Sequence, residues 1–484
     1  MGRTANMRIT DGLLIGVAAA VCFGSLAIVC SPQREPADVP PYVPGEGDPP
    51  DVEGPDAPRL PDSRYLLTRF LPEGHVQDGS VDYAAEVQAA VDAAAGGTLV
   101  LPDFPVRVAP RSGERFAVLI GAGLEVVGSP ASTLVVREEG VQLLRAVDVD
   151  GLVLRDFRVA GPGGDGRGMG HGLVQILRGS DVRIERLRVE GADADGIAVA
   201  VVEGVHVVDC AVRGASKSSV YVSSSRRVVV RGNRISGGGG HVTPGGSVVG
   251  VGVQLSSNSE VLCSDNVVDG GLGIGILCNA LGGGEAPIGN TITGNRIRGV
   301  DNPFNVDGSS GIKLANGAAD KRTRTVVSGN VIDGCGAYGI HLENHGASVV
   351  EGNQVFSSAR AGIVVGSVER VVVARNTLFD DGTEPSRGLD AIMLINDARG
   401  VVVRDNEIQR TGALASAKAI PSDRSQTRAN VLVPRVSAMR SAPTAGEWRR
   451  GDVVLSLEPS FDGPVGWVCV SAGAPGSWRG FGSH

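Results

Sequence analysis

The chain has 484 residues and is 42% hydrophobic, 20% charged and 4% aromatic, with 71 glycines and a net charge of −8. The hydrophobic fraction excludes disorder over most of the chain, and the glycines follow no Gly-X-Y period, which excludes collagen. The net charge and the scattered basic residues argue against nucleic acid as a partner.

Residues 1–30 predict an export signal or a membrane anchor. Arg3 and Arg8 precede 19 residues without a charge, from Gly12 to Cys30. This length reaches the roughly 18 residues of a membrane span and exceeds the ~7 to 15 of a signal-peptide core. Both interpretations place the folded part outside the cytoplasm, so we expect a secreted or envelope-anchored protein that contacts the membrane only through this segment.

Residues 31–63 are rich in Pro, Asp and Glu and lack periodicity, which predicts an extended linker. Apolar residues then recur at helical spacing over about 82–95, Gly96 and Gly97 end the helix, and the strand TLVL follows. Such a helix would cap a solenoid, because an uncovered first coil exposes core and strand edges.

The stretch that begins VDYAAEVQAAVDAAAGGTLVLP at Val81 resembles the entry of right-handed parallel β-helix proteins of the pectate-lyase-like superfamily. The resemblance continues through the following repeats to about Thr411. It implies an all-β fold for residues 64–411, a right-handed single-stranded parallel β-helix solenoid with an N-terminal helical cap. It implies no single activity, because this fold carries lyases, hydrolases, epimerases, esterases and phage tailspikes.

A short phrase recurs through the repeat region: an apolar strand, a polar pair, then Asn, with a β-branched or aliphatic residue two places after the Asn. Successive copies are 23 to 35 residues apart, as expected for coils with loops of different length. The aligned asparagines are Asn233, Asn266, Asn295, Asn330, Asn353, Asn376 and Asn406. Phe157, Leu187 and Cys210 occupy the same column earlier in the chain, and we expect the cysteines outside the leader to be mostly small buried hydrophobes.

A further strand of each coil, such as GVQLSS, GIKLAN or GIHLEN, predicts an outward column because successive side chains alternate faces. That column reads Gln175, Ala198, Tyr221, Gln254, Gly275, Lys313, His341, Val364 and Met393. Lys313 and His341 fall on neighbouring coils, and Glu343 lies two places beyond His341. We predict Lys313, His341, Glu343 and Tyr221 as a general acid/base set lining a groove.

Four other residues are predicted to bind substrate beside this groove. Gln254 extends the outward column, Asp195 precedes the strand GIAVAV, and His241 and Asp307 belong to long insertions. Functional residues often lie on such loops over a rigid scaffold. No cofactor is predicted; the Asp-rich loops could bind calcium, but no compact ligand spacing is present.

Comparison with two families of this fold, the polygalacturonases and the alginate epimerases, shows which of their sequence motifs this chain lacks. Asp195 in ADADGIAV is similar to the first carboxylate of polygalacturonases, but Ser218 and Ser219 replace the paired Asp on the next coil. His171 in GHGL precedes Asp195, whereas in that family the His motif follows. The Asp-Pro-His signature of alginate epimerases is absent from the sequence.

Residues 412–430 predict a polar linker, and residues 431–484 predict a small β module with short strands between Gly and Pro turns. The module contains Trp448, Trp467 and Trp478, which we interpret as its core, with a sugar-stacking surface as the alternative. The module resembles the carboxy-terminal modules of bacterial and phage β-helix proteins, which implies a role in assembly or attachment.

The sequence therefore predicts an exported carbohydrate-active β-helix whose partner is a polysaccharide. A polysaccharide lyase or C5-epimerase acting on a uronic-acid polymer suits the Lys, His and Tyr column best. A non-catalytic glycan- or partner-binding surface protein is the alternative. A polygalacturonase-like glycoside hydrolase is the third option.

Overall fold

The structure is a computed structural model. It describes residues 64–164, 172–239, 241–242, 248–271, 273–280, 287–302, 308–315, 323–379, 391–396, 398–409, 425–428, 431–432, 436–446, 448, 450–459 and 463–482. Among these residues, no helix has the length and apolar character needed to cross a membrane.

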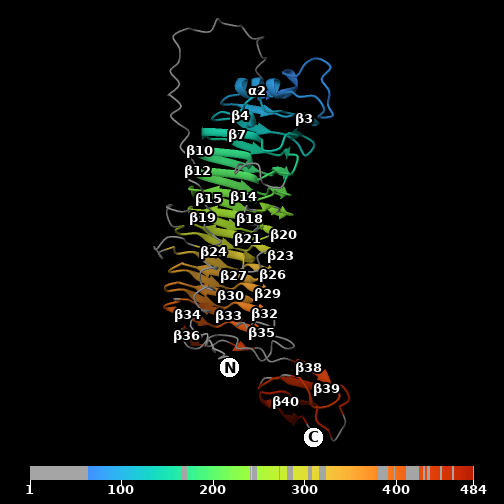
Figure 1. Cartoon of the computed structure of the whole chain (residues 1–484), viewed down its shortest axis with the longest axis vertical. Coiled ribbons are helices and arrows are strands. Elements are labelled where there is room, and N and C mark those ends of the chain that lie inside the picture. Colours follow the sequence, from blue (N-terminus) through green and yellow to red (C-terminus); the bar gives the residue numbers. More distant parts are fainter. Residues whose placement is uncertain are drawn as a thin grey trace, which may run out of the picture. The chain divides into compact units, whose positions relative to one another are not determined.

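The coils form the right-handed parallel β-helix expected from the sequence (Figure 1). Each coil contributes strands to three rows, here named A, B and C in the order in which the chain passes through them. Rows A and B join in one 24-stranded sheet, which also contains β17 (His241–Val242), and row C is a separate 13-stranded sheet. Strands within a row pair in parallel with the next coil.

Row A consists of β4 (Phe116–Ile120), β7 (Gln142–Asp150), β10 (Gly172–Glu185), β12 (Asp195–Val208), β14 (Ser218–Ser223), β18 (Val248–Ser256), β21 (Gly273–Asn279), β24 (Ser310–Ala315), β27 (Tyr338–Glu343), β30 (Ala361–Gly366) and β33 (Ile392–Ile395). The strands β10 and β12 continue into row B. The other strands of row B are β1 (Arg64–Leu66), β2 (Thr98–Val100), β5 (Glu125–Val127), β8 (Val153–Arg155), β15 (Arg226–Arg231), β19 (Ser259–Ser264), β22 (Thr291–Thr293), β25 (Val326–Ser328), β28 (Val349–Glu351), β31 (Val372–Ala374), β34 (Val401–Arg404) and β36 (Ser425–Arg428).

Row C consists of β3 (Pro105–Arg107), β6 (Thr133–Val135), β9 (Arg158–Ala160), β11 (Arg188–Glu190), β13 (Ala211–Arg213), β16 (Arg234–Ser236), β20 (Val267–Gly271), β23 (Arg296–Val300), β26 (Val331–Asp333), β29 (Gln354–Phe356), β32 (Thr377–Phe379), β35 (Glu407–Gln409) and β37 (Val431–Leu432). Most row C strands have three residues with only the middle one buried, so the first and third side chains face outward.

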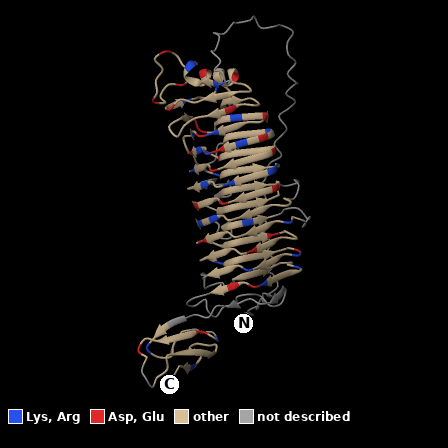
Figure 2. Ribbon diagram, turned by 180° about the vertical axis from the view of Figure 1, so that it is seen from behind, with Lys and Arg blue, Asp and Glu red and all other residues tan. Residues whose placement is uncertain are grey.

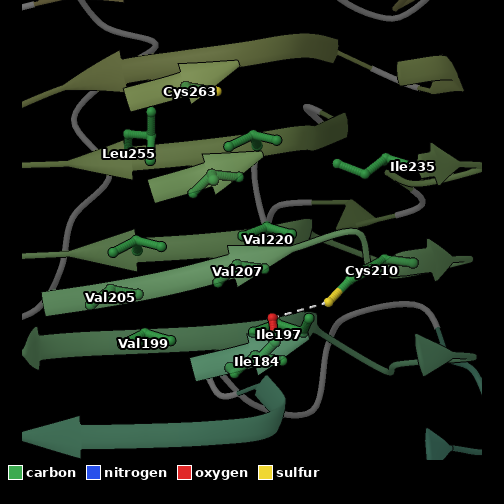
Figure 3. Packing of buried hydrophobic residues seen from close by; sticks show 14 of the residues in the cluster. Ile184, Ile197, Val199, Val205, Val207, Cys210, Val220, Ile235, Leu255 and Cys263 are labelled. Carbon is green, nitrogen blue, oxygen red and sulfur yellow. Dashed lines mark hydrogen bonds between the residues drawn. The ribbon is translucent and has the colours of Figure 1, made fainter. Parts of the chain in front are cut away.

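The core between the rows is built from stacked Val, Ile and Leu side chains (Figure 3). Ile197, Val220 and Val253, for example, hold the same position on three successive coils and are fully buried. Cys210, Cys263, Cys278 and Cys335 fill the same space, and Cys469 is buried in the carboxy-terminal sheet. None of these five buried cysteines forms a disulfide within the described part of the chain, and their burial agrees with the sequence prediction.

The Asn column forms a buried ladder at the corner between rows B and C. The residue before each Asn has a left-handed backbone, as at Gly232 (φ 68°) and Asp265 (φ 58°), which explains why Gly and Asp recur there. The Nδ2 group of Asn266 donates to Oδ1 of Asn295 at 2.9 Å, and the backbone N–H of Asn266 donates to the same oxygen at 3.0 Å. These bonds tie each coil to the next, which is why the repeat keeps Asn.

A second polar ladder, which the sequence analysis missed, lies at the corner between rows A and B. The backbone N–H of Ser225 donates to Oδ1 of Asn258 at 2.8 Å, and the backbone N–H of Val202 donates to Oγ of Ser225 at 3.1 Å. His345 and Val368 hold the equivalent corner on later coils, as the pairing of Gly346 with Glu369 shows. The changing residue type at this corner hid the ladder from a search for repeated letters.

The first coils are covered by the helix α2 (Ala84–Ala93), which follows the short 3-10 helix η1 (Leu67–Arg69). Val87, Ala90 and Val91 of α2 are buried in the main core. The helix therefore covers apolar surface that the first coil would otherwise expose.

The carboxy-terminal strands form a separate four-stranded sheet, made of β38 (Val436–Met439), β39 (Val453–Ser456), β40 (Gly466–Ser471) and β41 (Ser477–Phe481). Trp448, Val454 and Cys469 form its core, and the rings of Trp448 and Trp478 meet edge to face at 4.8 Å. Trp467 packs against the same core. The interpretation of the tryptophans as core residues is therefore confirmed.

Candidate functional site

The outward column of row A carries the predicted site residues. Register pairing links Gln175, Ala198, Tyr221 and Gln254 on four successive coils, as the sequence predicts. The next position is Leu277 and not Gly275, because Ile276, not Ile274, pairs with Val253 and Ile312. Lys313, His341, Val364 and Met393 complete the column.

Lys313 and His341 are paired on adjacent coils of row A, so the prediction that they are neighbours is confirmed. Parallel strands place their backbones about 4.8 Å apart. Glu343 lies on the strand of His341, and its Oε2 atom is 4.0 Å from Nε2 of His341. The three groups therefore lie together, although 28 residues separate Lys313 from His341 in the chain.

Burial was not expected here, since the sequence predicts an open groove. Lys313 is only 6% exposed and His341 only 7%, whereas Glu343 is half-buried. Burial lowers the pKa of the Lys313 amine, an effect that nearby Glu343 partly opposes. Burial, helped by the charge of Lys313, lowers the pKa of His341 to about 3, so its imidazole is neutral at physiological pH.

Neither ring nitrogen of His341 hydrogen bonds to another described residue, although the side chain is almost fully buried. Buried polar groups normally have partners, and a group without one is a candidate for binding a ligand or water. The imidazole thus offers one N–H donor and one nitrogen acceptor beside the amine of Lys313.

Tyr338 is a member of this cluster that sequence reasoning missed. Its ring meets the His341 ring edge to face, with 5.1 Å between centroids. Strict alternation assigns Tyr338 to the inward side with Ile340, but Tyr338 is the first residue of β27 and is half-buried beside His341. The alternation rule fails at this corner, where the chain enters the strand.

Tyr221 lies in the same column but three coils from Lys313, about 14 Å along the axis. It is therefore too far away to act on the atom that Lys313 contacts. The prediction that both residues belong to one catalytic set is wrong in its geometry, and Tyr338 occupies the place beside His341 instead.

A polar network crosses the coils near Tyr221. Oγ of Ser218 donates to Oε1 of Gln254 at 2.9 Å, and Nε2 of Gln254 donates to Oγ of Ser256 at 3.1 Å. The buried Asp195 carboxylate accepts the backbone N–H of Ser218 at 2.9 Å. Gly172 and Ser218 flank Asp195 on the neighbouring strands, so no second carboxylate stands at its register there.

The two remaining predicted residues cannot be placed in the site. Asp307 lies outside the described residues, as does His171. The backbone of His241 belongs to β17, which pairs antiparallel with β18, but its side chain is not described. Among the described residues, no group of three or more His, Cys, Asp or Glu side chains could hold a metal ion.

The fold and the repeated ladders define a class, the parallel β-helix proteins. A family model described as the right-handed β-helix region matches residues 165–320 and 301–420, more than half of the chain. The chain therefore belongs to the right-handed β-helix family. A comparison with curated protein sequences gives no match.

Several solved structures are similar to this chain. The Agl-KA catalytic domain is 14% identical, with a TM-score of 0.51 over 78% of this chain and 69% of that chain. A mutant tailspike protein of E. coli bacteriophage HK620 in complex with a pentasaccharide is also 14% identical, with a TM-score of 0.50 over 73% and 68%. The Azotobacter vinelandii mannuronan C-5 epimerase AlgE4 A-module is 15% identical, with a TM-score of 0.44 over 76% and 94%. At 14% identity, the likeness to the Agl-KA domain and the tailspike establishes the fold alone.

Proposed function

We propose that this protein is an exported, carbohydrate-acting β-helix enzyme that removes the C5 proton of a uronic-acid residue in a polysaccharide. The observation that carries the proposal is the cluster of Lys313, His341, Glu343 and Tyr338 on two neighbouring coils. The buried amine of Lys313 lies beside a neutral imidazole whose ring nitrogens have no hydrogen-bond partner among the described residues, and such a pair is suited to proton transfer.

In this proposal, Lys313 acts in its neutral form as the base, since a lowered pKa makes the free amine more abundant near neutral pH. The C5–H bond breaks and its proton passes to the amine. The N–H of His341 donates to the uronate carboxylate and stabilises the negative charge that develops there.

The electron pair left at C5 then has two fates. In a lyase it forms the C4–C5 double bond, the C4–O bond breaks, and the Tyr338 hydroxyl supplies a proton to the leaving oxygen. In an epimerase a proton returns to C5 on the opposite face. In this proposal Tyr338, whose ring contacts that of His341, supplies the proton in either case.

A screen for unsaturated uronate ends, by ultraviolet absorbance, tests the lyase form across pectate, alginate and glycosaminoglycans. We expect activity on one of these polymers and its loss in Lys313→Ala and His341→Ala. Met393→Ala, in the same outward column two coils beyond His341, is the matched control and should keep activity. Full activity in both site variants would refute the site.

A second function, non-catalytic binding of a glycan or protein partner, is favoured by one observation. Lys313 and His341 are almost completely buried, so a substrate must displace neighbouring groups to reach them. A binding protein would retain a polysaccharide in a pull-down without releasing unsaturated ends or exchanging C5 protons. The hydrolase alternative lacks support, because Ser218 stands where a second carboxylate is needed beside Asp195.

A further inference from the structure

The outer face of row C gathers arginines that the linear sequence keeps far apart. They stand at first or third positions of row C strands, where side chains face outward. We name them the arginine strip: Arg158, Arg188, Arg213, Arg234, Arg296 and Arg298. Figure 2 shows basic segments in blue on many coils of the β-helix.

Most arginines of the strip have no counter-ion among the residues that the structure describes. Arg158 pairs with Glu190, and Arg298 pairs with Asp269 at 2.7 Å. The other four arginines, Arg188, Arg213, Arg234 and Arg296, are exposed and form no ion pair with any described residue. By contrast, many other exposed arginines of the coils are paired, as Arg178 is with Asp148.

The charge of this face differs from that of the whole chain. From β9 to β23, the outward positions of row C carry six arginines and only two acids, Glu190 and Asp269. The complete chain has a net charge of −8. The unpaired guanidinium groups of this face repel one another, and a bound anionic ligand would reduce that repulsion.

The spacing of the free arginines suits a linear ligand. Arg188, Arg234 and Arg296 occupy the same strand position on alternate coils, so they recur about every 10 Å along one line. A flat sheet face with a straight row of cations matches an extended polymer lying along the axis. A compact anion would contact only one of these guanidinium groups at a time.

Two linear polyanions match a row of cations: a single-stranded nucleic acid and an anionic polysaccharide. The side chains between the arginines favour the polysaccharide. Binding of single-stranded nucleic acid relies on aromatic side chains that stack on the bases. The outward positions from β9 to β23 hold no aromatic residue; Ala211, Ser236 and Val267 stand between the arginines. We propose that the arginine strip is a second binding face that holds an anionic polysaccharide along row C, separate from the Lys313 cluster on row A.

Dextran sulfate is the probe that tests this face, because it contains no uronic acid and cannot be a substrate of the proposed enzyme. The test variant is the triple substitution Arg188→Gln, Arg234→Gln and Arg296→Gln. The matched control is Arg178→Gln, Arg226→Gln and Arg375→Gln, which removes the same charge from exposed arginines that are ion-paired to acids. Thermal unfolding of both variants verifies that they are folded.

We expect the test variant to bind dextran sulfate roughly tenfold more weakly than the unaltered chain and to show a shallower dependence on salt, because fewer counter-ions are released. The control should stay within about twofold. Equally weakened dextran sulfate binding in both variants, or unchanged binding in the test variant, would contradict the proposal that the arginine strip is a binding face. Tighter binding of a single-stranded oligonucleotide than of dextran sulfate at equal salt would overturn the polysaccharide assignment.

Discussion

His341 and His345 are buried and neutral, their ring nitrogens have no hydrogen-bond partner in the part of the chain that the structure describes, and each makes folding sensitive to acid. Burial lowers the pKa of both imidazoles to about 3, below the ordinary value of 6.5. The unfolded chain therefore binds protons that the folded chain does not bind. Keeping these imidazoles neutral in the folded state has no free-energy cost above about pH 6.5. As the pH falls from there towards 3, the unfolded chain gains protons and the free energy of unfolding decreases.

This linkage predicts the effect of replacing His345 with the residue that holds its place on the next coil, Val368. His345→Val should unfold less readily in acid, because the buried His345 lowers the free energy of unfolding by about 1.4 kcal/mol for each pH unit between its two pKa values. The measurement is the thermal midpoint of both proteins between about pH 8 and pH 4. A parallel decline of the two curves would show that His345 does not titrate on unfolding.

At the scale of the element, the Asn ladder supplies the bonds between coils at the corner of rows B and C. Asn353 illustrates these contacts: its Nδ2 group donates to the carbonyls of Val327 at 3.0 Å and Glu351 at 3.2 Å, and to Oδ1 of Asn376 at 2.9 Å. Its Oδ1 accepts two N–H groups of Asn330. Removing the amide leaves several buried polar groups without partners.

We therefore expect Asn353→Ala to lower the free energy of unfolding by about 3 kcal/mol, since each unsatisfied buried group costs ~1 to 3 kcal/mol. Gln354→Ala alters the next residue, which is exposed on β29, and should cost less than about 0.5 kcal/mol. Urea unfolding followed by circular dichroism compares the two. Similar midpoints would mean that the ladder contributes little to stability.

Strand alternation and the repeat were enough to predict which coils bring Lys313 and His341 together. Alternation cannot tell apart two registers that differ by two residues, so the apolar pair Ile274 and Ile276 allowed Gly275 in place of Leu277. It also fails at a corner, where the entry to β27 turns Tyr338 towards His341. Burial of Lys313 depends on the packing of several segments around it, and a single strand pattern does not contain that information.

At the scale of the molecule, the stacking of coils in the β-helix brings residues that are far apart in the sequence side by side. Row A collects the Lys313 cluster, and row C collects the arginine strip. The two faces belong to different sheets and to different coils, since Lys313 and His341 lie on β24 and β27 and the arginine strip runs from β9 to β23. A polymer held along row C would therefore be bound independently of the chain processed at row A.

The central claim is that the Lys313 cluster abstracts the C5 proton, and loss of the C5 proton signal measures that step for a lyase and an epimerase alike. A lyase leaves a C4–C5 double bond, whereas an epimerase returns solvent deuterium to C5. A uronic-acid polymer that the protein binds is therefore incubated in D2O, and its C5 protons are followed by NMR. We predict exchange or elimination at C5 with the unaltered chain and with Met393→Ala, and at least a hundredfold loss with Lys313→Ala, in line with the ~10²–10⁴ contribution of a general base. Bound polymer that keeps its C5 protons with the unaltered chain would contradict the claim.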